Sequence, residues 1–206
     1  MPPFYRGQEV NTLPVIISGK QGSGKSTTAD LVKAGLRGLG IPVISYKFAG
    51  PIYEMHDVIL PILKSYGLIA PDETKVGRIL QLLGTEGGRE FFGEDVWVRC
   101  ALKAYEAQID PDGLGSVLEP KVFLVDDARF PNELGAFREF GYAVRLECSR
   151  EVRKARCPKW RDTDDHISET ALDGLSNAFH DVFDTAILSS EAVAATVVAN
   201  IRGRLR

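Results

Sequence analysis

The chain has 206 residues, of which 44% are hydrophobic and 26% charged, and its formal net charge is −3. An apolar content near the globular average excludes a disordered or collagen-like chain, and no apolar run approaches the roughly 18 residues of a membrane span. The acidic balance excludes a strongly basic face that wraps nucleic acid. We therefore expect one globular domain, residues 1–206, with neither nucleic-acid nor membrane partners.

The cellular compartment is indicated by the first residues and by the cysteines. The first ten residues, MPPFYRGQEV, have no apolar run before a small-residue cleavage site, so they do not resemble a secretory signal. Cys100, Cys148 and Cys157 form no CxxC pair and are odd in number, which predicts free thiols in a reducing environment. Both features favour a cytoplasmic protein.

Strand and helix patterns alternate along the chain. In chain order, the first half predicts a strand at 13–18, a helix at 28–39, a strand at 43–48, and helices at 51–66, 76–83 and 95–108. Pro61 is expected to kink or divide the second of these helices, and Gly84 to close the third.

The second half predicts a surface loop at 110–120, a strand at 121–125, a helix that starts at Pro131, a strand at 142–147, a charged segment at 149–166, a helix at 168–175, a strand at 185–188 and a helix at 191–205. The alternation predicts an α/β fold whose parallel sheet is covered by helices on both faces.

The segment GKQGSGKST at 19–27 satisfies the phosphate-loop pattern GxxxxGK[ST] between the first strand and the first helix. Glycines allow the backbone to approach a phosphate, and the loop amides and the helix N-terminus attract its charge. Lys25 is expected to reach the β- and γ-phosphates of ATP, and the Ser26 hydroxyl to bind Mg²⁺. The alternative is a glycine-rich turn with a solvated lysine. The expected ATP contacts are Gly22, Ser23, Gly24, Lys25, Ser26 and Thr27.

Two carboxylates end the apolar run VFLVDD at 122–127, as in a Walker B element. One of Asp126 and Asp127 is expected to hold Mg²⁺, usually through a water. The alternative is that they cap the turn before the next helix. The sequence does not choose between the two residues.

Several arginines lie in segments that could contact a phosphate. Arg129 follows the carboxylates at the carboxyl edge of the sheet, where α/β proteins bind ligands. Arg153 and Arg156, three residues apart in the charged segment, share a helix face and could belong to a lid over the transferring phosphate. A solvated charged helix is the other interpretation of that segment.

Three further residues have two interpretations each. Trp97 lies on an apolar helix face and is either core or a base-stacking residue, and Trp160 lies in a polar segment with the same two alternatives. His166 is either a lid or substrate contact or part of a helix-capping segment that includes Ser168.

The motifs together resemble a known family. They are the phosphate loop, KFAGPI at 47–52, RILQLLGTEGGR at 78–89 with Trp97 after it, DARFPNE at 127–133 and DHISE at 165–169. In this order they resemble the deoxynucleoside monophosphate kinases of tailed bacteriophages, a branch of the P-loop nucleoside monophosphate kinases. The resemblance covers about residues 13–190. One departure lies near the C-terminus: family members often have an asparagine after the last strand, whereas this chain reads DTAILS at 184–189, which affects the adenine-side contacts.

The resemblance implies transfer of the ATP γ-phosphoryl group to a deoxynucleoside monophosphate (dNMP) with Mg²⁺, in the host cytoplasm if the chain is phage-encoded, and it is compatible with a homodimer. It implies a helical monophosphate-binding region at about 48–108, an arginine-rich lid at about 149–167 that includes Arg150 as an ATP contact, and catalytic roles for Lys25, Arg129, Arg153 and Asp127. The implied acceptor contacts are Lys47, Phe48, Arg78, Gln81, Arg89, Trp97, Arg129, Glu133, Trp160, His166 and Glu169.

Two other functions are consistent with a phosphate loop. One is a P-loop kinase for another small phosphorylated metabolite, such as a phosphomevalonate-type substrate. The other is a non-catalytic nucleotide-binding protein, although a GTPase switch would need an NKxD segment and the sequence has none. The sequence does not indicate which base is accepted or whether a ribose is refused.

Overall fold

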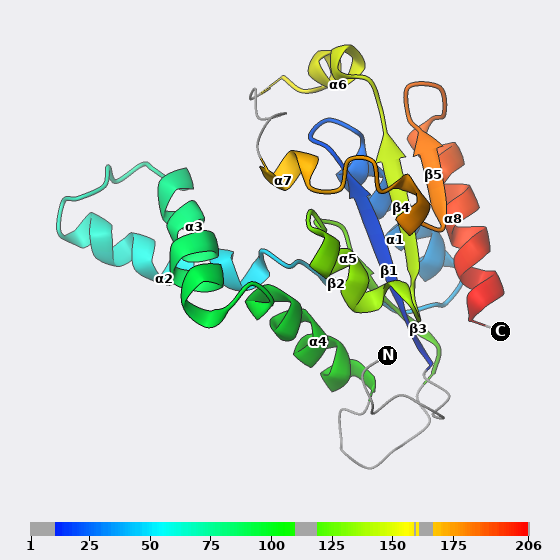
Figure 1. Cartoon of the computed structure of the whole chain (residues 1–206), viewed down its shortest axis with the longest axis horizontal. Coiled ribbons are helices and arrows are strands. Elements are labelled where there is room, and N and C mark those ends of the chain that lie inside the picture. The colour runs from blue at the N-terminus through cyan, green and yellow to red at the C-terminus, as the bar shows by residue number, and fades with distance from the viewer. Residues whose placement is uncertain (1–10, 110–118, 159, 161–166, 206) are drawn as a thin grey trace.

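The computed structural model describes residues 11–109, 119–158, 160 and 167–205. Within these ranges, five parallel strands form one sheet in the order β2-β3-β1-β4-β5 (Figure 1). The strands are β1 (Thr12–Gly19), β2 (Val43–Tyr46), β3 (Lys121–Val125), β4 (Tyr142–Glu147) and β5 (Asp181–Asp184). Strand β1 is central, and Val15 is paired with Leu124 of β3 on one side and Tyr142 of β4 on the other. The predicted parallel α/β fold is confirmed.

Helices cover both faces of the sheet. Helices α1 (Lys25–Gly38) and α8 (Ser190–Arg204) pack on one face, and α4 (Val96–Ile109) and α5 (Pro131–Arg138) pack on the other. Successive residues of β1 serve opposite faces: Val15 and Ile17 belong to the core under α1 and α8, whereas Ile16 belongs to the core under α4 and α5. Each fully buried aliphatic side chain contributes about 1.5–3 kcal/mol, which is why strands buried on both faces are continuously apolar.

A helical arm, residues 50–90, extends from one side of the sheet (Figure 1). It consists of α2 (Gly50–Ser65), α3 (Gly77–Gly84) and the π-helix η2 (Thr85–Glu90). No residue of α3 is buried, and α2 buries only His56 and Leu60. The imidazole Nε2 of His56 accepts the N–H of Val76 at 3.2 Å, which ties the arm's long connection to α2. The helices predicted at 51–66, 76–83 and 95–108 are confirmed as α2, α3 and α4.

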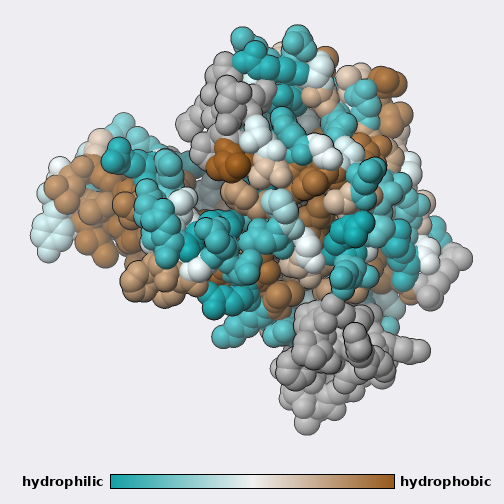
Figure 2. Space-filling model, viewed as in Figure 1, coloured by the Kyte–Doolittle hydropathy of each residue, from teal (hydrophilic) through white to brown (hydrophobic). Residues whose placement is uncertain are grey.

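The arm also carries much of the exposed apolar surface. Figure 2 shows brown, hydrophobic side chains gathered over α2 and α3. The large exposed apolar residues of the arm are Tyr53, Met55, Val58, Ile62, Tyr66, Leu68 and Leu82. None of the helices in the described ranges combines the length and the apolarity that crossing a bilayer requires.

Several predicted elements differ from the structure. The predicted strand at 185–188 is wrong, because the edge strand is β5 at Asp181–Asp184 and the next four residues form a turn. Helix α2 is continuous through Pro61, which is exposed, so the helix is not divided there. Gly84 does not close its helix, since η2 follows without a break. The predicted helix at 168–175 is limited to α7 (Ile167–Thr170) and a turn, and most of the predicted loop at 110–120 lies outside the described residues.

Candidate active site

The phosphate loop joins β1 to α1 at the carboxyl edge of the sheet. Its backbone at Gly22 and Gly24 has φ of 77° and 88°, a left-handed conformation that favours glycine. A Cβ on Gly22 would lie 2.7 Å from the carbonyl oxygen of Arg153, so the loop also needs glycine to pass under α6 (Arg150–Arg156). No side chain of the described residues caps α1, and its first-turn N–H groups therefore remain available to an anion.

Lys25 begins α1 within a cluster of positive charge. Its Nζ donates to the carbonyl oxygen of Lys20 at 2.8 Å. The pKa of Lys25 is lowered from 10.5 to about 8, chiefly by burial and also by the nearby charges of Arg129 and Arg145, while Glu169 and Asp126 oppose the shift. Several cations therefore share one small region, which is the arrangement that a polyphosphate would neutralise.

The two carboxylates after β3 have different environments. Both oxygens of Asp127 accept backbone N–H groups, from Phe48 at 2.9 Å and Ala49 at 3.0 Å. Burial raises the pKa of Asp127, although these two hydrogen bonds oppose the rise. Asp126 Oδ1 lies 4.0 Å from the Nζ of Lys47, and no backbone N–H of the described residues donates to its carboxylate. The arrangement leaves Asp126 the freer carboxylate, while Asp127 holds the start of α2 against the sheet.

No group of three or more His, Cys, Asp or Glu side chains in the described ranges is placed to hold a metal ion. A magnesium ion in this site would therefore take few ligands from the protein, as is usual where phosphates and waters supply the rest. The exposed Ser26 hydroxyl at the start of α1 and the Asp126 carboxylate are oxygen donors of the kind that Mg²⁺ prefers. The three cysteines are free, as predicted.

A cleft of about 670 Å³ separates the arm from the phosphate loop side of the sheet. Its walls include several residues predicted as acceptor contacts: Phe48, Gln81, Arg89, Trp97, Arg129 and Glu133. The Trp97 side chain is 5% exposed, and its indole N–H donates to the carbonyl oxygen of Gly84 at 3.0 Å. Trp97 therefore supports the turn from α3 into η2 and contributes one wall of the cleft.

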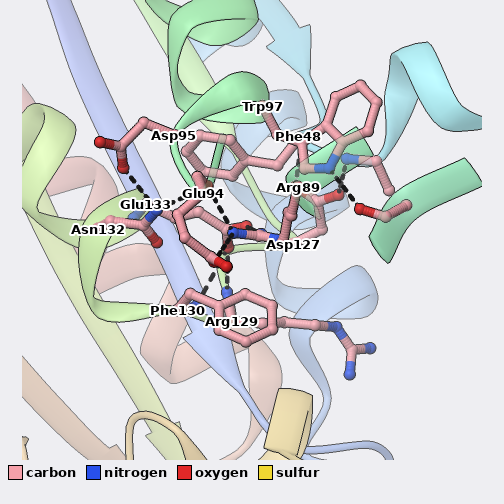
Figure 3. A network of polar contacts seen from close by, with 12 residues as sticks. Phe48, Arg89, Glu94, Asp95, Trp97, Asp127, Arg129, Phe130, Asn132 and Glu133 are labelled. Atoms are coloured by element: carbon pink, nitrogen blue, oxygen red, sulfur yellow. Dashed lines mark hydrogen bonds and ion pairs between the residues drawn. The ribbon is translucent and has the colours of Figure 1, made fainter. Parts of the chain in front are cut away.

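Glu133 joins the two arginines of this cleft (Figure 3). Its Oε1 accepts from Nη2 of Arg89 at 2.7 Å, and its Oε2 accepts the backbone N–H of Arg129 at 2.8 Å and that of Phe130 at 3.2 Å. The Arg89 guanidinium also lies over the Phe130 ring, 4.3 Å from its centroid. Glu133 is the third residue of α5, which begins at Pro131. From this position a glutamate side chain reaches back to the backbone N–H of the N-cap residue, here Phe130. Its carboxylate faces protein donors, so it fixes the arginines.

Arg129 itself points toward the phosphate loop. Its Nη1 donates to a carboxylate oxygen of Glu169, and the other oxygen of Glu169 accepts the N–H of Gln21 in the loop at 3.0 Å. The structure thus brings together the phosphate loop, the DARFPNE segment and the DHISE segment, which lie far apart in the sequence. Of the last segment, His166 lies outside the described residues.

The arginines of the predicted lid are bound to different groups. Arg153 is buried, and its Nη1 donates to the carbonyl oxygen of Gln21 at 3.0 Å while its guanidinium lies 5.3 Å from the centre of the Trp160 ring. Arg156 donates to the carbonyl oxygen of Thr185 at 2.8 Å. Arg150 is exposed at the start of α6. Arg153 therefore fastens α6 to the phosphate loop, and Trp160 packs against it.

A second cleft, of about 480 Å³, lies on the other side of the phosphate loop. Its lining includes Ser26, Thr27, Arg156 and Leu188. Four predicted acceptor residues of the described ranges do not line the larger cleft. Arg78 is exposed on α3 and Lys47 is exposed beside Asp126. Trp160 packs on Arg153, and Glu169 is buried beside Arg129.

Sequence reasoning missed Arg145. This residue of β4 is buried, its Nη1 donates to the Ser18 hydroxyl at 3.1 Å, and its Nη2 lies 3.4 Å from Asp173. Asp173 also accepts from Nζ of Lys20 at 2.6 Å, so the pair reaches the phosphate loop. A charged residue inside the apolar strand YAVRLE was the available signal, because an arginine is rarely buried without a partner.

Comparison with known proteins shows the fold. No family model and no curated protein matches the chain. Shikimate kinase from Acinetobacter baumannii in complex with shikimate has a TM-score of 0.51 at 12% identity, covering 94% of this chain and 95% of that one. Shikimate kinase from Bacteroides thetaiotaomicron has a TM-score of 0.51 at 19% identity, covering 94% and 98%. Mycobacterium tuberculosis APS kinase in complex with AMPPNP and APS has a TM-score of 0.51 at 15% identity, covering 93% and 98%. The chain has the fold of P-loop kinases.

Proposed function

We propose that this chain is a kinase that transfers the γ-phosphoryl group of ATP to the phosphate of a dNMP. The observation that carries the proposal is that Arg129 lies between the cleft and the phosphate loop. It lines the 670 Å³ cleft, and its charge lies close enough to Lys25 of the phosphate loop to lower the pKa of that lysine. An anion in the cleft and the end of a triphosphate on the loop would therefore meet at these two cations.

The residues fit the parts of such a reaction. The loop amides and Lys25 would hold the β- and γ-phosphates, and Ser26 and Asp126 would hold Mg²⁺, which supplies charge neutralisation on the phosphates. Asp127, predicted as a metal ligand or catalytic residue, would instead keep the Phe48 and Ala49 backbone in place through the two hydrogen bonds described above. Positioning the entrance of α2 in this way sets one wall of the acceptor cleft.

The chemistry would require little proton transfer from the protein. The nucleophile would be an oxygen of the acceptor's own phosphate, which is largely a dianion at neutral pH because its second pKa is about 6. The remaining work would be to align the two anions and to neutralise the charge on the transferring group, the task of Lys25 and Arg129. Arg153, bound to two backbone carbonyl groups, would act by holding α6 against the loop.

The shape of the cleft favours an acceptor with a ring system. Its volume lies within the roughly 300–1,000 Å³ of small-molecule sites. Phe48 and Trp97 provide aromatic walls, and the Gln81 amide is able to hydrogen-bond the edge of a base. The lining thus combines arginines with aromatic rings, and a nucleoside monophosphate carries the corresponding partners, a phosphate and a base.

A kinase for a different small metabolite is the second candidate. It is favoured by the likeness to shikimate kinase in complex with shikimate, which has the same TM-score as the likeness to APS kinase. A non-nucleotide acceptor of the phosphomevalonate type would use Arg129 in the same way and would leave the aromatic walls unused.

An acceptor panel tests the proposal. ADP release is measured by a coupled assay with each dNMP, each ribonucleotide counterpart, shikimate, APS and phosphomevalonate. We expect at least one dNMP to stimulate ADP release, and Lys25→Ala to abolish the stimulation while the protein remains folded by circular dichroism. Stimulation by a non-nucleotide acceptor alone would favour the second candidate. Absence of stimulation by any monophosphate would refute the nucleotide proposal.

A further inference from the structure

Two carboxylates hold Arg129 at different points. Glu133 accepts the backbone N–H of Arg129 at 2.8 Å and so fixes where the residue lies. Glu169 accepts from Nη1 of the guanidinium and so fixes where the side chain points. The Glu169 side chain is 5% exposed and that of Arg129 is 40% exposed, so the carboxylate is buried beneath an arginine whose outer part faces the cleft.

The other edge of the guanidinium is available. Nη1 of Arg129 contacts Glu169 and, at 3.5 Å, the Ser168 hydroxyl, whereas Nε and Nη2 have no partner among the residues that the structure describes. Figure 3 shows the Arg129 side chain extending away from the Glu133 cluster. A guanidinium anchored by one nitrogen can still offer two N–H groups to a phosphate, in the geometry that makes arginine a bidentate phosphate ligand.

Glu169 also reaches the phosphate loop. Its Oε2 accepts the N–H of Gln21 at 3.0 Å, while its other oxygen holds Arg129. Its negative charge raises the pKa of Lys25, which places the carboxylate within electrostatic reach of the phosphate site. One buried side chain therefore spans the nucleotide side and the acceptor side of the cleft.

We infer that Glu169 is a positioning residue that aims the free edge of Arg129 at the acceptor phosphate and keeps it in register with the phosphate loop. The inference deepens the proposed function and rests on its phosphate cleft, but not on the acceptor being a nucleotide. It differs from the direct acceptor contact that sequence resemblance implies for Glu169, because both carboxylate oxygens already face protein donors.

The chemistry of the contact explains why a carboxylate is required. An ionised carboxylate accepts on both oxygens, so it serves Gln21 and Arg129 together. Glu169→Gln keeps the size of the side chain but replaces one acceptor with an amide donor, so one of the two contacts is lost. Asp173→Asn is the matched control, because Asp173 lies four residues later and contacts Lys20 of the same loop without contacting Arg129.

A double-mutant cycle tests the inference. Binding of inorganic tripolyphosphate, which carries no nucleoside, is measured by calorimetry for the wild type, Glu169→Gln, Arg129→Ala and the double variant. Arg129→Ala removes charge-assisted hydrogen bonds and should weaken binding about tenfold or more. Glu169→Gln should weaken it about tenfold, the cost of ordering one long side chain that is no longer held. The double variant should match Arg129→Ala within about threefold, since the carboxylate acts through the arginine.

The outcomes separate the inference from the proposed function. If the Glu169→Gln and Arg129→Ala effects multiply in the double variant, as those of Asp173→Asn and Arg129→Ala should, Glu169 does not act through Arg129 and the inference is overturned. Failure of every dNMP to stimulate ADP release, together with a non-additive cycle, would leave the inference standing and reject the nucleotide acceptor. Should Glu169→Gln not fold, Glu169→Asp, which shortens the reach, must show the same non-additivity.

Discussion

The buried charge of Lys25 should cost stability. Lowering its pKa from 10.5 in the unfolded chain to about 8 in the native state costs about 3 kcal/mol at neutral pH, since each pH unit corresponds to about 1.4 kcal/mol. Lys25→Met removes the charge, keeps the length of the side chain and forfeits the hydrogen bond to Lys20, worth about 1 kcal/mol. We therefore expect Lys25→Met to be about 2 kcal/mol more stable than the wild type at pH 7 and inactive as a kinase.

The stability cost of the Lys25 charge depends on pH. Between pH 8 and 10.5 the unfolded chain keeps the Lys25 proton and the native state does not, so the cost is full below pH 8 and disappears as pH rises toward 10.5. Urea unfolding of both proteins at pH 7 and pH 10 should show the advantage of Lys25→Met shrinking. Lys64→Met is the control, because Lys64 is only half-buried and donates a similar 2.8 Å hydrogen bond to the carbonyl oxygen of Pro71. A Lys25→Met protein that is less stable at pH 7, or equally favoured at both pH values, would refute the reasoning.

Three further predictions concern other parts of the site. Gly88→Ala would place a Cβ 2.3 Å from the Trp97 ring, so unfolding in urea should show a loss of about 2–3 kcal/mol, and a loss below about 0.5 kcal/mol would contradict this packing. Asp126→Asn should raise the Mg²⁺ concentration that gives half-maximal activity by about tenfold or more and leave the melting temperature unchanged. Asp127→Asn should lower the free energy of unfolding by about 1–2 kcal/mol and leave that Mg²⁺ concentration unchanged. The reverse pattern would assign the metal to Asp127. The kcat/KM for ATP should fall above about pH 8 as Lys25 loses its proton, and Lys25→Arg, which stays charged, should lack that decline if it turns over at all.

The phosphate loop was predictable because its signal is local. Glycines at fixed spacing between an apolar strand and an amphipathic helix specify a strand–loop–helix unit, and the structure has β1, a left-handed Gly22 and Gly24, and α1 in these places. The carboxyl-edge position of Asp126 and Arg129 follows equally from the parallel sheet, since all strand ends meet there.

The position of the edge strand was mispredicted because the residues that form it are less apolar than the residues that follow it. Residues 185–188 read TAIL, whereas β5 reads DVFD, with two apolar residues between two aspartates. An edge strand pairs on one side only, so pairing with Val144–Glu147 of β4, rather than apolar content, decides where it lies. The N–H of Thr185 still donates to Glu147 at 2.8 Å as the last bond beside that ladder.

The hydrogen-bond partners of charged side chains could not be predicted from the sequence either. Arg153 resembles a free lid arginine at i, i+3 from Arg156, but its guanidinium is buried on backbone carbonyl groups of Gln21 and Cys148. Arg145 depends on Ser18, 127 residues away, for one of its contacts. Such pairings arise from the crossing of distant segments, which spacing within one segment cannot reveal.

The sparse burial in the arm has a dynamic consequence. Local opening needs the least free energy where few apolar side chains are sequestered, and α3 sequesters none while the strands of the sheet are closed on both sides. Amide hydrogens of α2 and α3 should therefore exchange with solvent through openings that leave β1 and α1 protected. The half of the cleft formed by the arm can then reshape around its ligand as a separate cooperative unit, without melting the half that carries the phosphate loop.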